Sequence, residues 1–173
     1  MACRKFLNCM IFALSVWATG AAVAEKADRD QPINIEADSG EVDDKSQIAR
    51  FFGNVVLIQG TLVLRADELE VKQENENFSI GIAKGNPAYF KQKREGYDDF
   101  IEGEAQRIEY DSTSEVLRMF TNAKLWRDGD VVHGDFITYD ANTEIFEAKG
   151  SLDENIGGNP KRVKAIIQPK KKD

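Results

Sequence analysis

Apolar and polar side chains alternate along most of the chain, whereas the three-to-four-residue spacing of an amphipathic helix is almost absent. Within residues 33–37, Ile33, Ile35 and Ala37 fall on one face and Asn34 and Glu36 on the other. A period of two, in segments rich in β-branched and aromatic residues, predicts β-strands. Further strands are predicted between Gly53 and Gly60 and over residues 62–64, 69–71, 78–82, 88–91, 100–102, 107–110, 115–120, 123–126, 131–133, 136–139, 144–148 and 164–167.

Glycine, asparagine and aspartate interrupt this alternation about every ten residues. Glycine adopts positive φ without steric cost, and Asn and Asp tolerate the same region, so these positions favour turns. We expect turns at residues 38–40, 53–54, 60, 85–87, 96, 128–130, 134 and 150. Such a density of short strands predicts an all-β fold, namely a sandwich, a barrel or a stacked β-roll.

The strand pattern repeats after 68 residues without a gap. The segment 46–54, SQIARFFGN, lines up with 114–122, SEVLRMFTN, and Ala66-Asp67 lines up with Gly134-Asp135 in the same frame. A fainter half-period of 39 residues relates 66–71 to 105–110. Because a repeat of about four strands that cannot close on itself stacks on the next, we expect about 14 to 16 short strands in two facing sheets.

A stacked fold of this kind leaves unpaired strand edges at its two ends, near Ile33 and near residues 163–167. Exposed edges recruit another strand, which is either an aggregation hazard or a route to head-to-tail assembly.

The N-terminus has the order of a secretory signal peptide. Arg4 and Lys5 precede an apolar run over residues 6–17, and small residues follow up to Ala24. The run is shorter than a bilayer span, and Ala22-Val23-Ala24 fits the A-x-A cleavage pattern. We therefore expect cleavage after Ala24, a domain over residues 25–168, and a disordered basic tail over residues 169–173.

Removal of residues 1–24 leaves 149 residues with 21 basic and 30 acidic side chains, a formal charge of −9. It also removes Cys3 and Cys9, so the mature chain has no cysteine. Nucleic acid is an unsuitable partner for such a chain, because its binding rests on clustered Lys and Arg. An exported protein without disulfides is compatible with an oxidising compartment.

The sequence offers little to an enzyme. No serine lies in a G-x-S-x-G setting, and the single histidine, His133, lies alone in a strand segment. Structural zinc lacks its usual Cys and His ligands. The acidic pairs at 98–99 and 128–130 have turn spacing and lack the further oxygen ligands of a calcium loop. We expect no catalytic residue, no metal and no cofactor.

Six segments in a fixed order resemble the OstA-like family of lipopolysaccharide transport proteins. They are QPINIEAD at 31–38, GNVVLIQGT at 53–61, RAD at 65–67, GNPAYF at 85–90, EGEA at 102–105 and GDFITY at 134–139. The resemblance covers about residues 31–150. It implies an open, twisted antiparallel β-jellyroll in the periplasm, whose interior receives the acyl chains of lipid A. It also implies end-to-end assembly between an inner-membrane lipopolysaccharide extraction complex and an outer-membrane lipopolysaccharide translocon.

The resemblance places Ile33, Ile35, Phe90 and Tyr110 in the interior. Together with the apolar faces of the predicted strands, it gives a candidate lipid-binding groove of Ile33, Ile35, Ala37, Leu62, Leu64, Leu69, Val71, Phe90, Ile108 and Tyr110. The same residues would equally fill an ordinary dry core, but small residues such as Ala37, Ala66, Ala83 and Ala105 favour an interior with spare room. Lys91, Lys93 and Arg94 form a candidate phosphate rim, and residues 161–164 form a second basic cluster.

Two alternatives stay open at this point. A structural or adaptor β-module would join envelope proteins without touching lipid. A membrane-anchored relative would keep its first apolar segment. An N-terminal piece of the outer-membrane translocon would need several hundred further barrel residues, which this chain lacks.

Overall fold

The computed structural model describes residues 28, 31–74, 77–151 and 162–169, so the predicted signal peptide and most of the basic tail lie outside the described residues. Nearly all of the described chain is β-structure. The strands are β1 (Asn34–Glu36), β2 (Ser39–Asp43), β3 (Ile48–Gln59), β4 (Leu62–Glu74), β5 (Asn77–Lys93), β6 (Phe100–Asp111), β7 (Val116–Arg127), β8 (Asp130–Asp140), β9 (Ile145–Lys149) and β10 (Lys164–Ile166). No helix among the described residues is long and apolar enough to cross a membrane.

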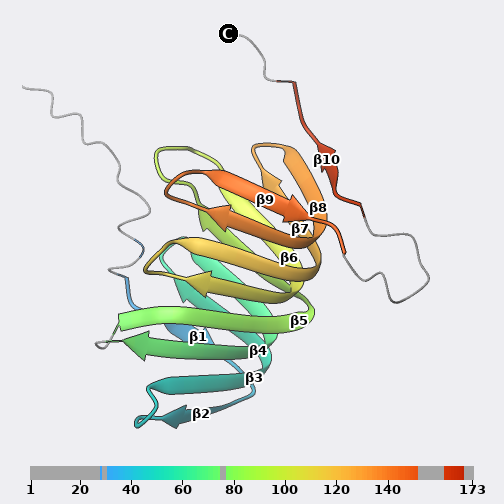
Figure 1. Cartoon of the computed structure of the whole chain (residues 1–173). Coiled ribbons are helices and arrows are strands. Elements are labelled where there is room, and N and C mark those ends of the chain that lie inside the picture. Colours follow the sequence, from blue (N-terminus) through green and yellow to red (C-terminus); the bar gives the residue numbers. More distant parts are fainter. Residues whose placement is uncertain (1–27, 29–30, 75–76, 152–161, 170–173) are drawn as a thin grey trace, which may run out of the picture.

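All ten strands belong to one open antiparallel sheet, in the order β1-β3-β4-β5-β6-β7-β8-β10. At one end, β1 and β2 both pair with β3, and at the other end β9 and β10 both pair with β8. Figure 1 shows the strands stacked from β2 at the bottom to β9 and β10 at the top. The all-β, open and antiparallel architecture confirms the prediction from the sequence.

The sheet is folded over along a line of register shifts, which we call the crease. The shifts fall between Phe52 and Val55 in β3, and opposite one another at 65/68, 84/88, 104/107 and 120/123 in the next four strands. Gly53 and Asn54 take positive φ at the crease, and so do Thr121 and Asn122 in the second repeat. An extra residue on one strand of a pair bends that strand sharply. The crease therefore divides each of β3–β8 into two halves.

The halves form two facing layers. Layer 1 comprises residues 39–43, 48–52, 68–74, 77–84, 107–111, 116–120, 136–140 and 145–149. Layer 2 comprises residues 34–36, 55–59, 62–65, 88–93, 100–105, 123–127, 130–134 and 164–166. The predicted short strands are mostly these halves. The strand number from sequence was too high because bulges at the crease interrupt the alternation without ending the strand.

Several predicted turns are wrong, most of them because they lie at the crease. Gly53-Asn54, Gly85-Asn-Pro87 and Gly134 lie within continuous strands at the crease, and Gly40 lies inside β2. Gly60, Gly96 and the 128–130 segment do lie at hairpin turns, although Asp130 already begins β8.

The repeat of 68 residues is confirmed by the strand boundaries. Strand β3, at 48–59, corresponds residue for residue to β7 at 116–127. Gln47 and Glu115 precede these strands with positive φ, and both crease pairs have positive φ as well. Each copy therefore supplies the same hairpin entry and the same bend.

Candidate functional site

The apolar faces of both layers meet in a single interior. Seven of the ten predicted groove residues, namely Leu62, Leu64, Leu69, Val71, Phe90, Ile108 and Tyr110, are at most 5% exposed. The other three, Ile33, Ile35 and Ala37, are half-buried and pack against this core. The alternation of each strand explains the arrangement, since every second residue points inward. The structure thus brings all ten predicted residues together.

Aromatic contacts join the two layers in the middle of the interior. Phe90 of layer 2 and Tyr110 of layer 1 lie with ring centroids 5.6 Å apart and tilted at 44°. Phe78 also stacks on Tyr110, with ring centroids 6.2 Å apart. Aromatic side chains bury a large apolar surface each, so these contacts help to hold the layers together.

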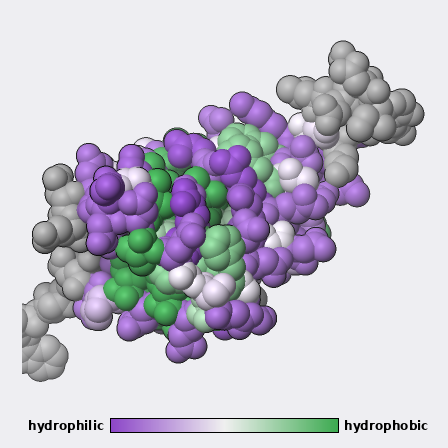
Figure 2. All heavy atoms as spheres, turned by 90° about the horizontal axis from the view of Figure 1, so that it is seen from below, coloured by the Kyte–Doolittle hydropathy of each residue, from purple (hydrophilic) through white to green (hydrophobic). Residues whose placement is uncertain are grey.

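The interior opens at the end of the stack formed by β1 and β2. A cleft of about 250 Å³ lies there between Ile33 and Ile35, at the β1 strand, and the apolar side chains of layer 1. The layer 1 side chains are Val42, Ile48, Ala49, Phe51 and Val71, and Asp43, Asp44, Gln47 and Gln73 form the polar rim. Figure 2 shows hydrophobic side chains gathered at this end and framed by hydrophilic ones. This cleft is the candidate functional site.

The rest of the interior is packed rather than open from end to end. Met119, Ile137 and Ile108 have no exposed surface, and Leu117 and Leu125 are 1% exposed. Of the alanines that favoured a roomy interior, Ala83 and Ala105 lie beside the crease and are fully buried, as is Ala88, while Ala66 is 8% exposed and Ala37 is half-buried. Side chains on the inner side of a sharp bend face the opposite layer at short range, so only small ones fit. These alanines therefore shape the bend and leave no room of their own.

Sequence reasoning missed Val42, which lines the cleft but is 69% exposed, and a group of buried interior residues. Val42 was overlooked because Asp38–Gly40 was interpreted as a turn, whereas β2 runs over Ser39–Asp43 and places Val42 at the cleft. Met119 and Ile137 lie in segments that were predicted as strands but were not assigned to the groove. Their alternation carried the same signal as that of the assigned residues.

The candidate phosphate rim is already neutralised by the protein's own carboxylates. Lys91 Nζ lies 3.1 Å from Glu102 Oε1, and Lys93 Nζ lies 2.9 Å from Asp98 Oδ1. Arg94 pairs with Asp99 and with Glu144. A phosphate would have to displace these partners, so the rim stays a prediction without geometric support. Of the second basic cluster, only residues 162–164 lie within the described residues, and they are exposed.

Two ionisable groups beside this rim have perturbed pKa values. Burial, together with the hydrogen bond that its hydroxyl donates to Glu102 at 2.6 Å, raises the pKa of Tyr89. The same hydrogen bond, reinforced by Lys91, lowers the pKa of Glu102 against the opposing effect of burial. The hydrogen bond between Tyr89 and Glu102 thus connects β5 to β6 on the outer side of layer 2.

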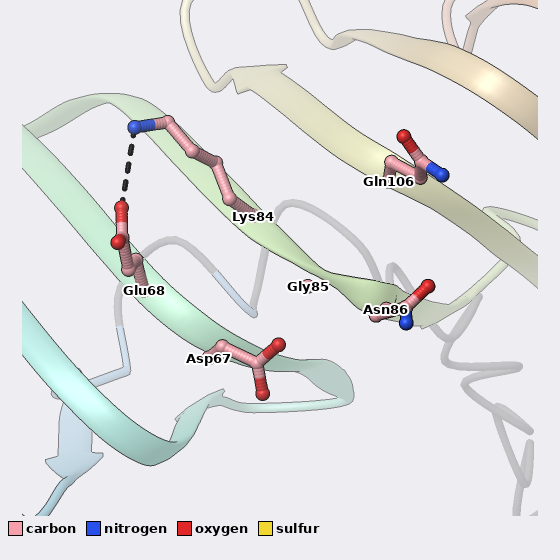
Figure 3. Close-up of a pocket in the computed structure, with 6 residues that line it drawn as sticks. All are labelled: Asp67, Glu68, Lys84, Gly85, Asn86 and Gln106. Carbon is pink, nitrogen blue, oxygen red and sulfur yellow. Dashed lines mark hydrogen bonds and ion pairs between the residues drawn. The ribbon is translucent and has the colours of Figure 1, made fainter.

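A second, polar pocket of about 440 Å³ lies at the crease and is lined by Asp67, Glu68, Lys84, Gly85, Asn86 and Gln106. Figure 3 shows these residues on three neighbouring strands, with Lys84 paired to Glu68 at 3.2 Å. Its side chains are polar and mostly exposed. The pocket is therefore unsuited to hydrocarbon.

The described residues assemble no recognisable catalytic or metal centre. No three His, Cys, Asp or Glu side chains among them lie close enough together to hold a metal ion. His133 lies in β8 beside Lys124 of β7 and Lys164 of β10. Burial, followed by these two lysines, lowers its pKa below the ordinary 6.5. The apolar cleft is thus the feature on which function is best argued.

Comparisons with known proteins identify the family of this chain. A family model described as LptA/(LptD N-terminal domain) LPS transport protein matches residues 34–145. The chain is 32% identical to the lipopolysaccharide export system protein LptH of Pseudomonas aeruginosa over 172 residues, covering 97% of this chain and 98% of that one. It is 29% identical to the lipopolysaccharide export system protein LptA of Escherichia coli K12 over 168 residues, covering 94% and 85%.

A solved structure is similar as well. The crystal structure of LptH from Pseudomonas aeruginosa, described as the LptA-homologous periplasmic component of the lipopolysaccharide transport device, superposes with a TM-score of 0.73 at 31% identity. The match covers 83% of this chain and 99% of that one.

Proposed function

Since the chain belongs to the LptA and LptD N-terminal-domain family of lipopolysaccharide transport proteins, we propose that it carries lipopolysaccharide by sheltering lipid A acyl chains between its two layers. The observation that supports this proposal is the apolar cleft of about 250 Å³ at the β1–β2 end, which leads into the buried interior. The predicted groove residues are those that would line the acyl path.

The physical requirement on such a carrier is continuous apolar cover. Each methylene of an acyl chain costs about 0.8 kcal/mol in water, so a chain of a dozen carbons amounts to roughly 10 kcal/mol. Long-range attraction would contribute little, because a mature protein with 21 basic and 30 acidic side chains repels an anionic glycolipid. Affinity then comes from burial of the acyl chains.

The N-terminal sequence supports a place of action. We propose export to the periplasm with cleavage after Ala24, as the signal-peptide pattern predicts. The relative with the solved structure is described as a periplasmic component, which supports the same compartment for this chain.

We further propose that copies join head to tail into a bridge from the inner-membrane extraction complex to the outer-membrane translocon. Within the described part of the chain, β1 and β2 each pair only with β3, and β9 and β10 each pair only with β8. Both ends of the stack thus offer strand edges to another copy or to a membrane partner.

A photo-crosslinking amino acid at Ile35 tests the lipid-carrying proposal. Ile35 lines the cleft, whereas its neighbour Glu36 is exposed and points to the other face of β1, so Glu36 is the matched control position. In cells, we expect lipopolysaccharide adducts at position 35 that are at least five-fold stronger than at position 36. Protein adducts without lipid at position 35 would instead support an adaptor module that joins envelope proteins.

A further inference from the structure

The strands pass from one layer to the other at the crease. At the edge of each layer that lies farthest from the crease, the strands are joined by hairpin turns. The loop between β5 and β6 belongs to layer 2, and the turn between β8 and β9 belongs to layer 1. In Figure 1 the yellow-green β5–β6 loop lies beside the orange β8–β9 turn. This is where the free margins of the layers meet.

Arg94 and Arg127 of layer 2 hold this margin to Glu144 of layer 1. Arg94 Nη2 donates to Glu144 Oε2 at 2.7 Å, across 50 residues of sequence. Arg127 Nη1 donates to the backbone carbonyl of Glu144 at 2.8 Å, and its guanidinium lies 4.9 Å from the ring of Phe146. Charge-assisted hydrogen bonds of this length are among the strong ones in proteins.

The cluster is buried but imperfectly satisfied. The Arg94 side chain is only 7% exposed, donates to Asp99 at 2.8 Å and stacks on Tyr97 at 3.9 Å. Within the described residues, Arg94 Nε and Asp99 Oδ1 are nonetheless buried without a hydrogen-bond partner. An unpartnered buried polar atom opposes burial. The closed margin is therefore held strongly by its ion pairs and at the same time carries a penalty that separation would relieve.

Local charge argues against an anion site here. Lys93, Arg94 and Arg127 are matched by Asp98, Asp99 and Glu144, and the same loop also carries Glu95, so the margin has no excess of positive charge. A phosphate would meet three carboxylates for its three cations. Closure between layers is the role that these contacts fit.

We propose that the contact between Arg94 and Glu144 is a reversible latch, which holds the layers closed and whose release lets an acyl chain pass from the cleft into the packed middle. This inference rests on the proposed lipid-carrying function. It answers a specific difficulty, because Phe90, Tyr110 and Met119 fill the interior beyond the cleft and only separation of the layers makes room there. The bulged crease, where ladder pairing is interrupted, is the natural hinge.

The test compares one protein in two states, with the margins of the two layers cross-linked and without the cross-link. The mature chain has no cysteine, so a double variant R94C/E144C offers one thiol pair, which a short bis-maleimide joins across the layers. The matched control is E68C/K84C, which joins β4 to β5 within layer 1 at an exposed ion pair. Benzoylphenylalanine at Phe90 reports lipopolysaccharide in the middle, and the same probe at Ile35 reports it at the cleft.

We expect cross-linking of the 94/144 pair to reduce the adduct at position 90 at least five-fold and to leave the adduct at position 35 intact. The 68/84 pair should change neither. An unchanged adduct at position 90 in the cross-linked 94/144 protein would overturn the latch. Absence of an adduct at position 35 before any cross-linking would contradict the lipid-carrying function itself.

A lipid-free measurement keeps the latch testable in that case. Glu144→Gln removes the charge at nearly constant shape, and Glu68→Gln is the matched control on an exposed pair. We expect amides of residues 88–93 to exchange with deuterium several-fold faster in Glu144→Gln than in Glu68→Gln. Equal exchange in the two variants would show that the pair does not hold the layers closed.

Discussion

Gly53 packs closely against the side chain of Asp38, and a Cβ built on Gly53 would lie 2.9 Å from Asp38 Cγ. The backbone N–H of Asp38 donates to the carbonyl of Gly53 at 3.0 Å, and the Asn54 side chain donates to Asp38 Oδ2 at 2.9 Å. The link between β1 and β2 is therefore fastened to the crease of β3. Because β1 and β2 form opposite sides of the cleft, this contact fixes how its two walls are connected.

Substitution of Gly53 by Ala should destabilise the protein more than the same change at Gly96. Both glycines have φ near +75°, at +78° and +74°, so both variants carry the cost of a left-handed alanine, about 1 kcal/mol. Only at Gly53 does the added methyl collide with Asp38, while nothing described lies within 4 Å at Gly96. We expect a loss of about 2–3 kcal/mol for Gly53→Ala in urea unfolding. Equal losses in the two variants would refute the steric argument.

Truncation of Phe90 should weaken the fold and enlarge the interior together. Phe90 is 1% exposed and touches Tyr110 across the layers, so Phe90→Ala should lower the free energy of unfolding by about 3–5 kcal/mol. If acyl chains enter the interior, they should fill the cavity that the ring leaves. Added lipopolysaccharide should then raise Tm more in the variant than in the wild type.

The matched control for this prediction is Phe90→Leu, which keeps an apolar side chain of intermediate size. Compared with Phe90→Ala, it should lose less free energy of unfolding, and added lipopolysaccharide should raise its Tm less, since a smaller cavity remains. A Tm increase that is the same in the wild type and in both variants would indicate that lipid does not reach Phe90.

The interior was largely predictable from sequence, because alternation with a period of two is a local signal. Leu62, Leu64, Leu69 and Val71 alternate along β4 and all face the core. The crease was not predictable as a bend, since a register shift depends on the neighbouring strand and not on the residues of one strand alone. Gly53-Asn54 has the composition of a turn, but pairing with β4 on both sides keeps it inside β3.

Contacts between distant segments account for the other differences. Gly40 indicated a turn, yet it lies in β2 and pairs with Phe51 of β3, and the Phe51 ring lies against the position where a side chain of residue 40 would be. Arg94 was assigned to a phosphate rim because its sequence neighbours are basic. Its actual partners are Asp99 and Glu144, and the latter lies 50 residues away, beyond what spacing in one sequence reveals.

A positive charge introduced on β10, the last strand, should weaken self-association without unfolding the protein. Ile166 of β10 and the adjacent Ile167 are 56% and 74% exposed, an unusual exposure for isoleucine, and within the described residues β10 pairs only with β8. Ile166→Lys should change the free energy of unfolding by less than about 0.5 kcal/mol, because the site is exposed. In sedimentation velocity at a series of protein concentrations, we expect the assemblies of the wild type to grow longer as the concentration rises. The variant should form assemblies of the same length only at higher concentration.

Thr113→Lys is the control for this prediction, since it adds the same charge at an exposed turn between β6 and β7, away from both ends of the stack. It should associate like the wild type. Weakening of association to the same extent in both variants would mean that net charge, and not the β10 edge, is responsible.

Acidic pH should loosen the β10 end through His133. Burial and the facing Lys124 and Lys164 lower the pKa of His133 below 6.5, so the folded state binds this proton less readily than the unfolded chain does. The stabilising contribution is therefore complete above pH 6.5 and is lost as the pH falls toward the lowered pKa. Asp98, Glu102 and Asp111 have pKa values below ordinary carboxylate values, so they change the free energy of unfolding only at pH values more acidic than this range.

In urea unfolding at pH 7.5 and 5.5, we expect the wild type to lose stability at the lower pH and His133→Gln to lose less, because Gln cannot take up the proton between the two lysines. An equal pH dependence in both proteins would assign the loss to other groups.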